Sequence, residues 1–142
     1  MKNHINAPTT RLWISRILIA IVFFFNIQCA FTFLTFPQLF AGSFELSGEV
    51  GQTWIRALGI LFTMWNVPYA VALWHPVNQR VSLWEAVVMQ GIGFAGETIL
   101  LLALPGIHPV LNSTVQRFIF FDGGGFLALL LSIWLISPSY TR

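Results

Sequence analysis

Four charged side chains stand inside long apolar stretches and are the sequence's clearest candidates for chemistry. They are two arginines and two carboxylates: Arg56, Glu97, Arg117 and Asp122. A charge at the centre of a membrane helix costs roughly 2.5–3.5 kcal/mol on insertion scales, so such residues turn toward other helices and find partners. At about 1.5 Å of rise per residue, all four are expected in the outer half of the membrane. A guanidinium can bind a carboxylate one turn away, so the sequence predicts an outer polar cluster.

This outer polar cluster has two interpretations. In the structural one, paired charges only fix the register of three helices. In the functional one, the charges line a cavity that opens outward and holds the polar head of a lipid or a small ligand, because ionisable residues inside a membrane are candidates for a site. A proton relay is disfavoured, since the inner half offers only Asn66, Gln90 and one pair at its edge.

Smaller polar residues recur near the cluster at steps of three and four, which place side chains on one helix face. The supporting polar residues are Asn26, Thr63, Asn66 and Gln90. They belong to four stripes of polar and small residues: Ser15, Val22, Asn26 and Cys29; Arg56, Gly59, Thr63, Asn66 and Ala70; Ala86, Gln90, Gly93 and Glu97; Asp122, Gly125, Leu129 and Ser132. Each stripe is expected to face the other helices, where small residues permit close approach. Near the inner face, Arg16 and Glu85 lie at matching depths and are expected to form a second ion pair.

The composition identifies the environment of the chain. Of its 142 residues, 56% are hydrophobic and 8% are charged, and the mean hydropathy is +0.76. A soluble domain carries about 25% charged residues. These values exclude a soluble enzyme and a disordered tail, and the single cysteine, Cys29, excludes an internal disulfide. An integral membrane protein remains.

Four apolar runs predict an all-α, polytopic membrane protein. They cover about 12–36, 53–74, 82–104 and 114–136, and prolines stand at or just beyond their ends. Each run is near the roughly 20 residues that cross a hydrocarbon core. The links are short enough to favour antiparallel neighbours, so residues 1–142 are expected to form one membrane domain, an up-down bundle of four transmembrane helices.

The positions of charged residues outside these runs predict the orientation. The basic residues there are Lys2, Arg11, Arg80 and Arg142, and the first link carries Glu45 and Glu49 instead. Because short cytoplasmic links are rich in Lys and Arg, both termini and the second link are expected in the cytoplasm. Phe40, Phe44 and Leu46 make the first link apolar, so it is expected to fold back over the outer end of the bundle.

Other motifs in the sequence have structural explanations. Residues 91–96 match GxGxxG, but the match lies within a span, where small residues serve helix contact. The three glycines after Asp122 favour close packing, a kink or contact with a lipid or cofactor tail. His4, His75 and His108 lie in the tail or at opposite helix ends, so no metal or haem site is predicted.

Two stretches resemble a known family. Residues 36–41 read Phe-Pro-Gln-Leu-Phe-Ala, and residues 55–62 read Ile-Arg-Ala-Leu-Gly-Ile-Leu-Phe. In this order the stretches are similar to small four-helix bacterial membrane proteins of the BphX-like kind and, more distantly, to DoxX-like proteins. The resemblance covers most of the chain in topology and the first two helices in motif. It implies a bacterial cytoplasmic-membrane protein. Some DoxX-like proteins are subunits of quinone-linked oxidoreductases, but no residue role is transferred here, because the Gly and Lys pattern that often ends their first helix is absent.

The function expected from the sequence is not enzymatic. No Ser–His–Asp, Cys–His or zinc-binding set can be assembled. The first hypothesis is an accessory or scaffold subunit that contacts membrane lipids and packs against a larger membrane complex or against itself as a homo-oligomer. The alternative is a small protein that binds or transports a ligand, such as a lipid or a quinone, in an outer-side pocket between the helices. No other cofactor is predicted, and the scattered basic residues argue against nucleic acid.

Overall fold

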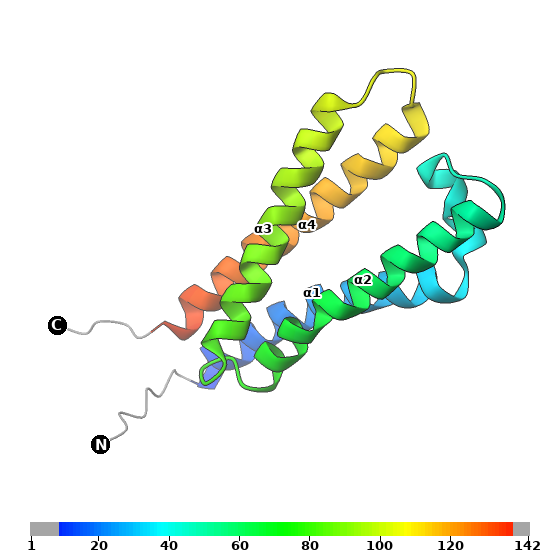
Figure 1. Cartoon of the computed structure of the whole chain (residues 1–142). Helices are drawn as coiled ribbons and strands as arrows, with labels where there is room; N and C mark the ends of the chain where they lie inside the picture. The colour runs from blue at the N-terminus through cyan, green and yellow to red at the C-terminus, as the bar shows by residue number, and fades with distance from the viewer. Residues whose placement is uncertain (1–8, 138–142) are drawn as a thin grey trace.

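The chain folds into four long helices that run up and down in one bundle (Figure 1). The computed structural model describes residues 9–137. The helices are α1 (Thr9–Thr35), α2 (Gly48–Trp74), α3 (Arg80–Ala103) and α4 (Pro109–Ile136), with two short 3-10 helices, η1 (Pro37–Leu39) and η2 (Ala41–Phe44), between α1 and α2. The predicted all-α, up-down architecture is therefore confirmed.

Each of the four helices is long and apolar enough to cross a membrane. Large apolar side chains point outward along them, and Ile92, Leu102 and Phe120 are among the most exposed. In water such a surface would drive aggregation, whereas lipid tails cover it at no cost. Helix length and hydropathy together identify a multi-pass membrane protein.

All four helices begin earlier than the apolar pattern suggests, and two of them begin five residues earlier. Helix α2 starts at Gly48 rather than near residue 53, and α4 starts at Pro109 rather than near residue 114. Proline at the first helical position suits a helix start, because its fixed φ is helical and its missing N–H is not needed there. The longer α4 places Asp122 about 20 Å from either end of the helix. Asp122 thus lies near the middle of α4, deeper than expected.

The bundle is built from two hairpins. Helices α1 and α2 pack along each other, as do α3 and α4, while α1 with α4 and, least of all, α2 with α3 join the two pairs. In Figure 1 the start of α1 and the end of α4 lie together at one end of the bundle, and the η1–η2 connection lies beside the start of α4 at the other end. Within the first hairpin, α2 comes close to the backbone of α1 at Gly59. A Cβ atom there would lie 2.9 Å from Leu34 Cγ and 3.0 Å from the Ala30 carbonyl oxygen.

Buried apolar residues form two clusters along the bundle, and these clusters and the two bundle ends are named inner and outer after the predicted orientation. The inner cluster includes Ile19, Leu83 and Leu129, which are fully buried. The outer cluster is centred on Phe33 and Ile55 and includes Ala41 of η2.

The η1–η2 connection closes the outer end of the bundle. The Phe33 ring centroid lies 4.8 Å from that of Phe40 and 5.9 Å from that of Phe44. The Phe44 ring in turn meets Phe118 of α4 at 6.0 Å. Aromatic pairs at these separations add attraction beyond burial alone. The apolar first link therefore folds back over the bundle, as its composition predicts.

The contact at Gly59 yields the first testable prediction. Gly59→Ala should lower the free energy of unfolding by about 1–3 kcal/mol, because the added methyl meets backbone atoms of α1 that cannot move aside. Unfolding of the purified protein in mixed micelles by added SDS, followed by circular dichroism, measures this loss.

Gly96→Ala is the matched control, since a Cβ at Gly96 has no neighbour within 4 Å. This variant should be unchanged or gain up to about 1 kcal/mol from its better helix propensity. Equal stabilities of the two variants would contradict close packing of α1 on α2.

Candidate functional site

A chain of hydrogen bonds crosses the middle of the bundle from α2 to α4. The Tyr69 hydroxyl donates to Gln90 Oε1 at 2.5 Å, and Gln90 Nε2 donates to Asp122 Oδ1 at 2.8 Å. Tyr69 is 2% exposed and Gln90 is 3% exposed, so this central polar chain (Tyr69, Gln90 and Asp122) lies inside the protein. Buried polar groups in an apolar medium need partners, and here they supply one another.

The first helix joins the same site. Asn26 of α1 lies near the Tyr69 side chain, and Cys29 of α1, Tyr69 of α2 and Glu97 of α3 lie near the Asp122 carboxylate. Side chains of all four helices are therefore gathered around this level of the bundle.

Two glycines make room for the central polar chain. A Cβ atom at Gly93 would overlap the Asp122 carboxylate, and one at Gly125 would lie 2.5 Å from Gln90 Nε2. The small residues that the sequence places between polar ones on α3 and α4 thus let the polar side chains fit between the two helices. Gly93 of the GxGxxG match has this packing role.

Asn66 belongs to the same level of the bundle as Asn26. Gly59 of α2 packs against Ala30 and Leu34 of α1, and the two helices are antiparallel. Asn66 lies about two turns further along α2, so it is at about the level of Asn26, two turns back along α1.

Two side-chain oxygens of this region have no hydrogen-bond donor among the described residues. One is Asn66 Oδ1, whose residue is 3% exposed and whose Nδ2 donates to the Phe62 carbonyl at 2.7 Å. The other is Glu97 Oε2, on a half-buried residue one turn beyond Gly93. Leaving a buried acceptor without a donor costs about 1–3 kcal/mol. The centre of the bundle is thus richer in acceptors than in donors.

The arginines of the predicted outer polar cluster lie elsewhere. Arg56 and Arg117 are exposed, and Arg117 donates to the Ser113 carbonyl and to Thr114 Oγ1 within its own helix. Across residues 9–137, neither arginine forms an ion pair with a carboxylate. The expected pairing is therefore wrong, because both side chains start about 12 Å from the outer helix ends and can reach water along the surface.

The orientation of α2 explains the position of Arg56. Its buried face carries Ile55, Gly59, Asn66 and Tyr69. The remaining members of the predicted α2 stripe are exposed: Arg56, Thr63 and Ala70. The stripes of the other helices lie at buried or half-buried positions throughout.

The expected inner ion pair does not form either. Arg16 donates to the Trp74 carbonyl at 3.0 Å, whereas Glu85 is exposed. Arg80 makes the equivalent bond to the Ile136 carbonyl at 2.7 Å. Both arginines bind the last carbonyls of a helix, where positive charge is favoured. Arg16 therefore finds its partner at the end of α2 rather than on α3.

Sequence reasoning missed Tyr69, the residue that carries the central polar chain to α2. Its position three residues after Asn66 was the available signal, since it continues that face of the helix. Two serines also meet at the inner end, where Ser15 Oγ and Ser132 Oγ are 2.6 Å apart and fully buried. The stripes of α1 and α4 contain both residues, but the sequence did not predict their contact.

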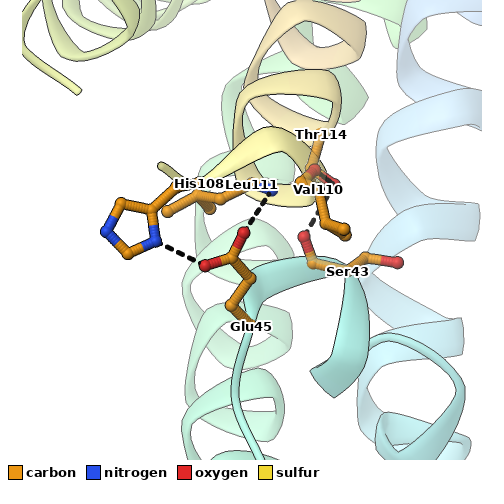
Figure 2. A network of polar contacts seen from close by, with 6 residues as sticks. All are labelled: Ser43, Glu45, His108, Val110, Leu111 and Thr114. Atoms are coloured by element: carbon orange, nitrogen blue, oxygen red, sulfur yellow. Dashed lines mark hydrogen bonds and ion pairs between the residues drawn. The ribbon is translucent and has the colours of Figure 1, made fainter. Parts of the chain in front are cut away.

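A second polar network links the two hairpins at the outer end (Figure 2). Glu45 Oε2 lies 2.5 Å from His108 Nδ1, and Glu45 Oε1 accepts the Leu111 N–H at 3.2 Å. Thr114 Oγ1 donates to the Ser43 carbonyl at 2.7 Å. A carboxylate at the start of a helix accepts hydrogen bonds from the free backbone N–H groups and is attracted by the positive end of the helix dipole. This outer latch (Glu45, His108, Leu111, Thr114 and Ser43) holds the first link against α4.

The outer latch changes the acidity of Glu45. The hydrogen bond from His108 is the main cause that lowers the pKa of Glu45 below its ordinary value of 4.5, and the Leu111 N–H adds to it. Each bond stabilises the ionised carboxylate more than the neutral acid. The latch is therefore favoured when Glu45 is charged.

The described residues contain no group of three or more His, Cys, Asp or Glu side chains that could hold a metal ion. His4, Lys2 and Arg142 lie outside the described part of the chain. Comparison with known proteins finds no match to a family model, a curated protein or a solved structure. The resemblance to BphX-like and DoxX-like proteins therefore stays a prediction.

The central polar chain predicts the effect of a change at Gln90. Gln90→Leu keeps the volume but removes both hydrogen bonds, leaving Asp122 without its donor, so the protein should lose about 1–3 kcal/mol of unfolding free energy. SDS-induced unfolding measures this loss of free energy. Gln116→Leu, at an exposed position of α4, should change stability by less than about 0.5 kcal/mol. If both variants unfold alike, the chain does not hold the helices together.

The outer latch predicts a dependence of stability on pH. Since the pKa of Glu45 is lowered in the folded protein, ionised Glu45 stabilises the fold above pH 4.5 and this stabilisation disappears as the pH falls through the folded value. Glu45→Gln should thus melt at a lower temperature than the parent at pH 7, and the difference should shrink below pH 4.5. Thermal melts at pH 7 and below pH 4.5, with Glu49→Gln in the first turn of α2 as the control, test this. An equal difference at both pH values would contradict the assignment.

Proposed function

We propose that this four-helix membrane protein is a non-enzymatic accessory subunit of the cytoplasmic membrane, which associates laterally with a second copy or with a larger membrane complex. The observation that carries the proposal is a shallow, open groove on the outside of the bundle, along α3 where it meets α2 at Pro68. The groove has a volume of about 650 Å³ and is lined by Pro68, Val81, Trp84, Glu85, Val88 and Met89.

The position of the groove favours a protein occupant. It lies between the two helices that pack least extensively in the bundle, so the chain itself leaves it open. Its one carboxylate, Glu85, is exposed beside Trp84 on a lipid-facing surface. Glu85 lies about 8 Å from the start of α3, near the inner interface, where a partner helix can supply a donor or a cation. A helix with a polar group near the inner interface therefore suits this groove.

An amide on α1 gives independent support. Gln28 is exposed, although it lies within the span, about 10 Å from the outer end of its helix. Its side chain has no hydrogen-bond partner within residues 9–137. Amide side chains on membrane helices stabilise association by bonding across to a neighbour. The interior polar groups, in contrast, mainly bond one another, which favours a structural role for most of them.

A second candidate function is the binding of a small ligand between the helices. The observation in its favour is the pair of acceptors without donors, Asn66 Oδ1 and Glu97 Oε2. The exposed positions of Arg56 and Arg117 weigh against the wider outer pocket expected for a lipid head or a quinone.

Native mass measurement after mild extraction tests the accessory role. The full-length chain should appear with a second copy or a fixed partner. Val88→Trp fills the groove and should weaken the association at least about tenfold, since overpacking by a large ring costs about 1–3 kcal/mol.

Phe120→Trp is the matched control, because Phe120 is 81% exposed on α4 and is not among the residues that line the groove. Its association should equal that of the parent. A monomer under all extraction conditions, including lipid nanodiscs, would refute the proposal.

A further inference from the structure

We infer that the outward face of α1 pairs with α1 of a second copy, and that the two Gln28 amides bond each other across a two-fold axis. This α1 face consists of the exposed side chains of Ile14, Ile17, Ile21, Phe24, Gln28 and Phe31. The inference rests on the lateral association proposed above and names one partner and one face for it. The groove lies along α3, so it stays open for a different partner.

The first support is the state of the Gln28 side chain. Gln28 is exposed, and its amide has no hydrogen-bond partner within residues 9–137. The exposed hydroxyls of Thr35 and Thr63, in contrast, donate to carbonyls one turn back in their own helices. With α1 centred in the membrane, Gln28 lies about 9 Å from the middle of a hydrocarbon core that is roughly 30 Å thick. Lipid tails offer the amide neither a donor nor an acceptor, so a protein partner is favoured.

The second support is the absence of charge from the α1 face. Helix α1 has no Asp, Glu, Lys or Arg from Ile17 to Thr35. The other three helices each expose a charged side chain: Arg56 on α2, Glu85 on α3 and Arg117 on α4. Two copies that met symmetrically on one of those faces would bring like charges together, which opposes pairing. Among the described helices, α1 therefore offers the face best suited to its own copy.

The third support is the spacing of the α1 face. Its members follow one another at alternating steps of three and four residues. This seven-residue repeat is the pattern by which two parallel helices pack with a left-handed crossing. Each apolar member is at least 43% exposed, so the bundle itself leaves the whole face uncovered.

The membrane fixes the geometry of the pair. A second copy inserts with the same orientation, so the two α1 helices run parallel, and a two-fold axis along the membrane normal places each residue of the face opposite itself. A glutamine amide both donates and accepts, so two Gln28 side chains can form reciprocal N–H···O bonds. One polar pair in an otherwise apolar contact also fixes the register of the helices. The chemistry of the α1 face is thus complementary to itself.

Disulfide cross-linking of the full-length chain in native membranes tests the face. In a Cys29→Ala background, Ile21→Cys and Phe24→Cys should each form a cross-linked dimer, because opposed positions of two paired helices come within reach of a disulfide. Leu127→Cys is the matched control on α4, where Leu127 is 67% exposed. This control should remain monomeric on non-reducing gels.

A change at Gln28 tests the amide pair. Gln28→Leu keeps a similar volume at an exposed position, so the fold should persist while the dissociation constant of the dimer, measured by sedimentation equilibrium in detergent micelles, rises about tenfold. Gln116→Leu removes an exposed amide from α4 and should dimerise as the parent does. Val88→Trp changes the groove and should leave the cross-link at Ile21→Cys intact.

Either of two results would overturn the inference. One is cross-linking of Leu127→Cys as strong as that of Ile21→Cys. The other is a Gln28→Leu protein that dimerises as tightly as the parent. Neither result bears on the groove, because the groove contact is tested by Val88→Trp. Conversely, α1 cross-links in a protein whose association does not respond to Val88→Trp would support this pair and refute the groove.

Discussion

The hydrogen bond between Tyr69 and Gln90 links the two hairpins inside an environment that gives helices little other reason to meet. Lipid tails are as apolar as leucine, so burial of apolar surface does not separate helix contact from lipid contact. Packing and polar contacts remain, and the central polar chain of Tyr69, Gln90 and Asp122 supplies the polar part. It fixes the rotation of α3 and α4 about their axes, because each side chain reaches its partner from one helix face only. The close approach at Gly93 and Gly125 follows from that requirement.

The two ends of the bundle are closed by different interactions. At the inner end, Arg16 and Arg80 bind the last carbonyls of α2 and α4, so Arg80, one of the charges that predict the orientation, also caps a helix. At the outer end, aromatic rings and the outer latch hold the first link against α4. Between the ends, α2 and α3 touch least, and the groove that we assign to a partner lies along this seam.

The architecture could be predicted from the sequence because hydropathy and helix stops act locally. Residue spacing also predicted which faces of α1, α3 and α4 point inward, and Gln90 and Asp122 on two of these faces are hydrogen-bonded. The arginine partners could not be predicted, since depth alone does not give the rotation of α2. The rotation of α2 about its axis exposes Arg56 and buries Tyr69. In the sequence alone, Tyr69 cannot be told from an ordinary interfacial or core tyrosine. Contacts between distant residues, such as Glu45 with His108, leave no periodic signal at all.

The division into two hairpins has a consequence for how the protein is made. Helices α1 and α2 leave the ribosome first and carry Asn26, Asn66 and Tyr69, whereas Gln90 and Asp122 arrive with the second pair. The bond from Tyr69 to Gln90 therefore cannot form until both pairs are in the membrane. Until then Tyr69 lacks its acceptor from the second hairpin, and the half-made chain is exposed to membrane chaperones and proteases.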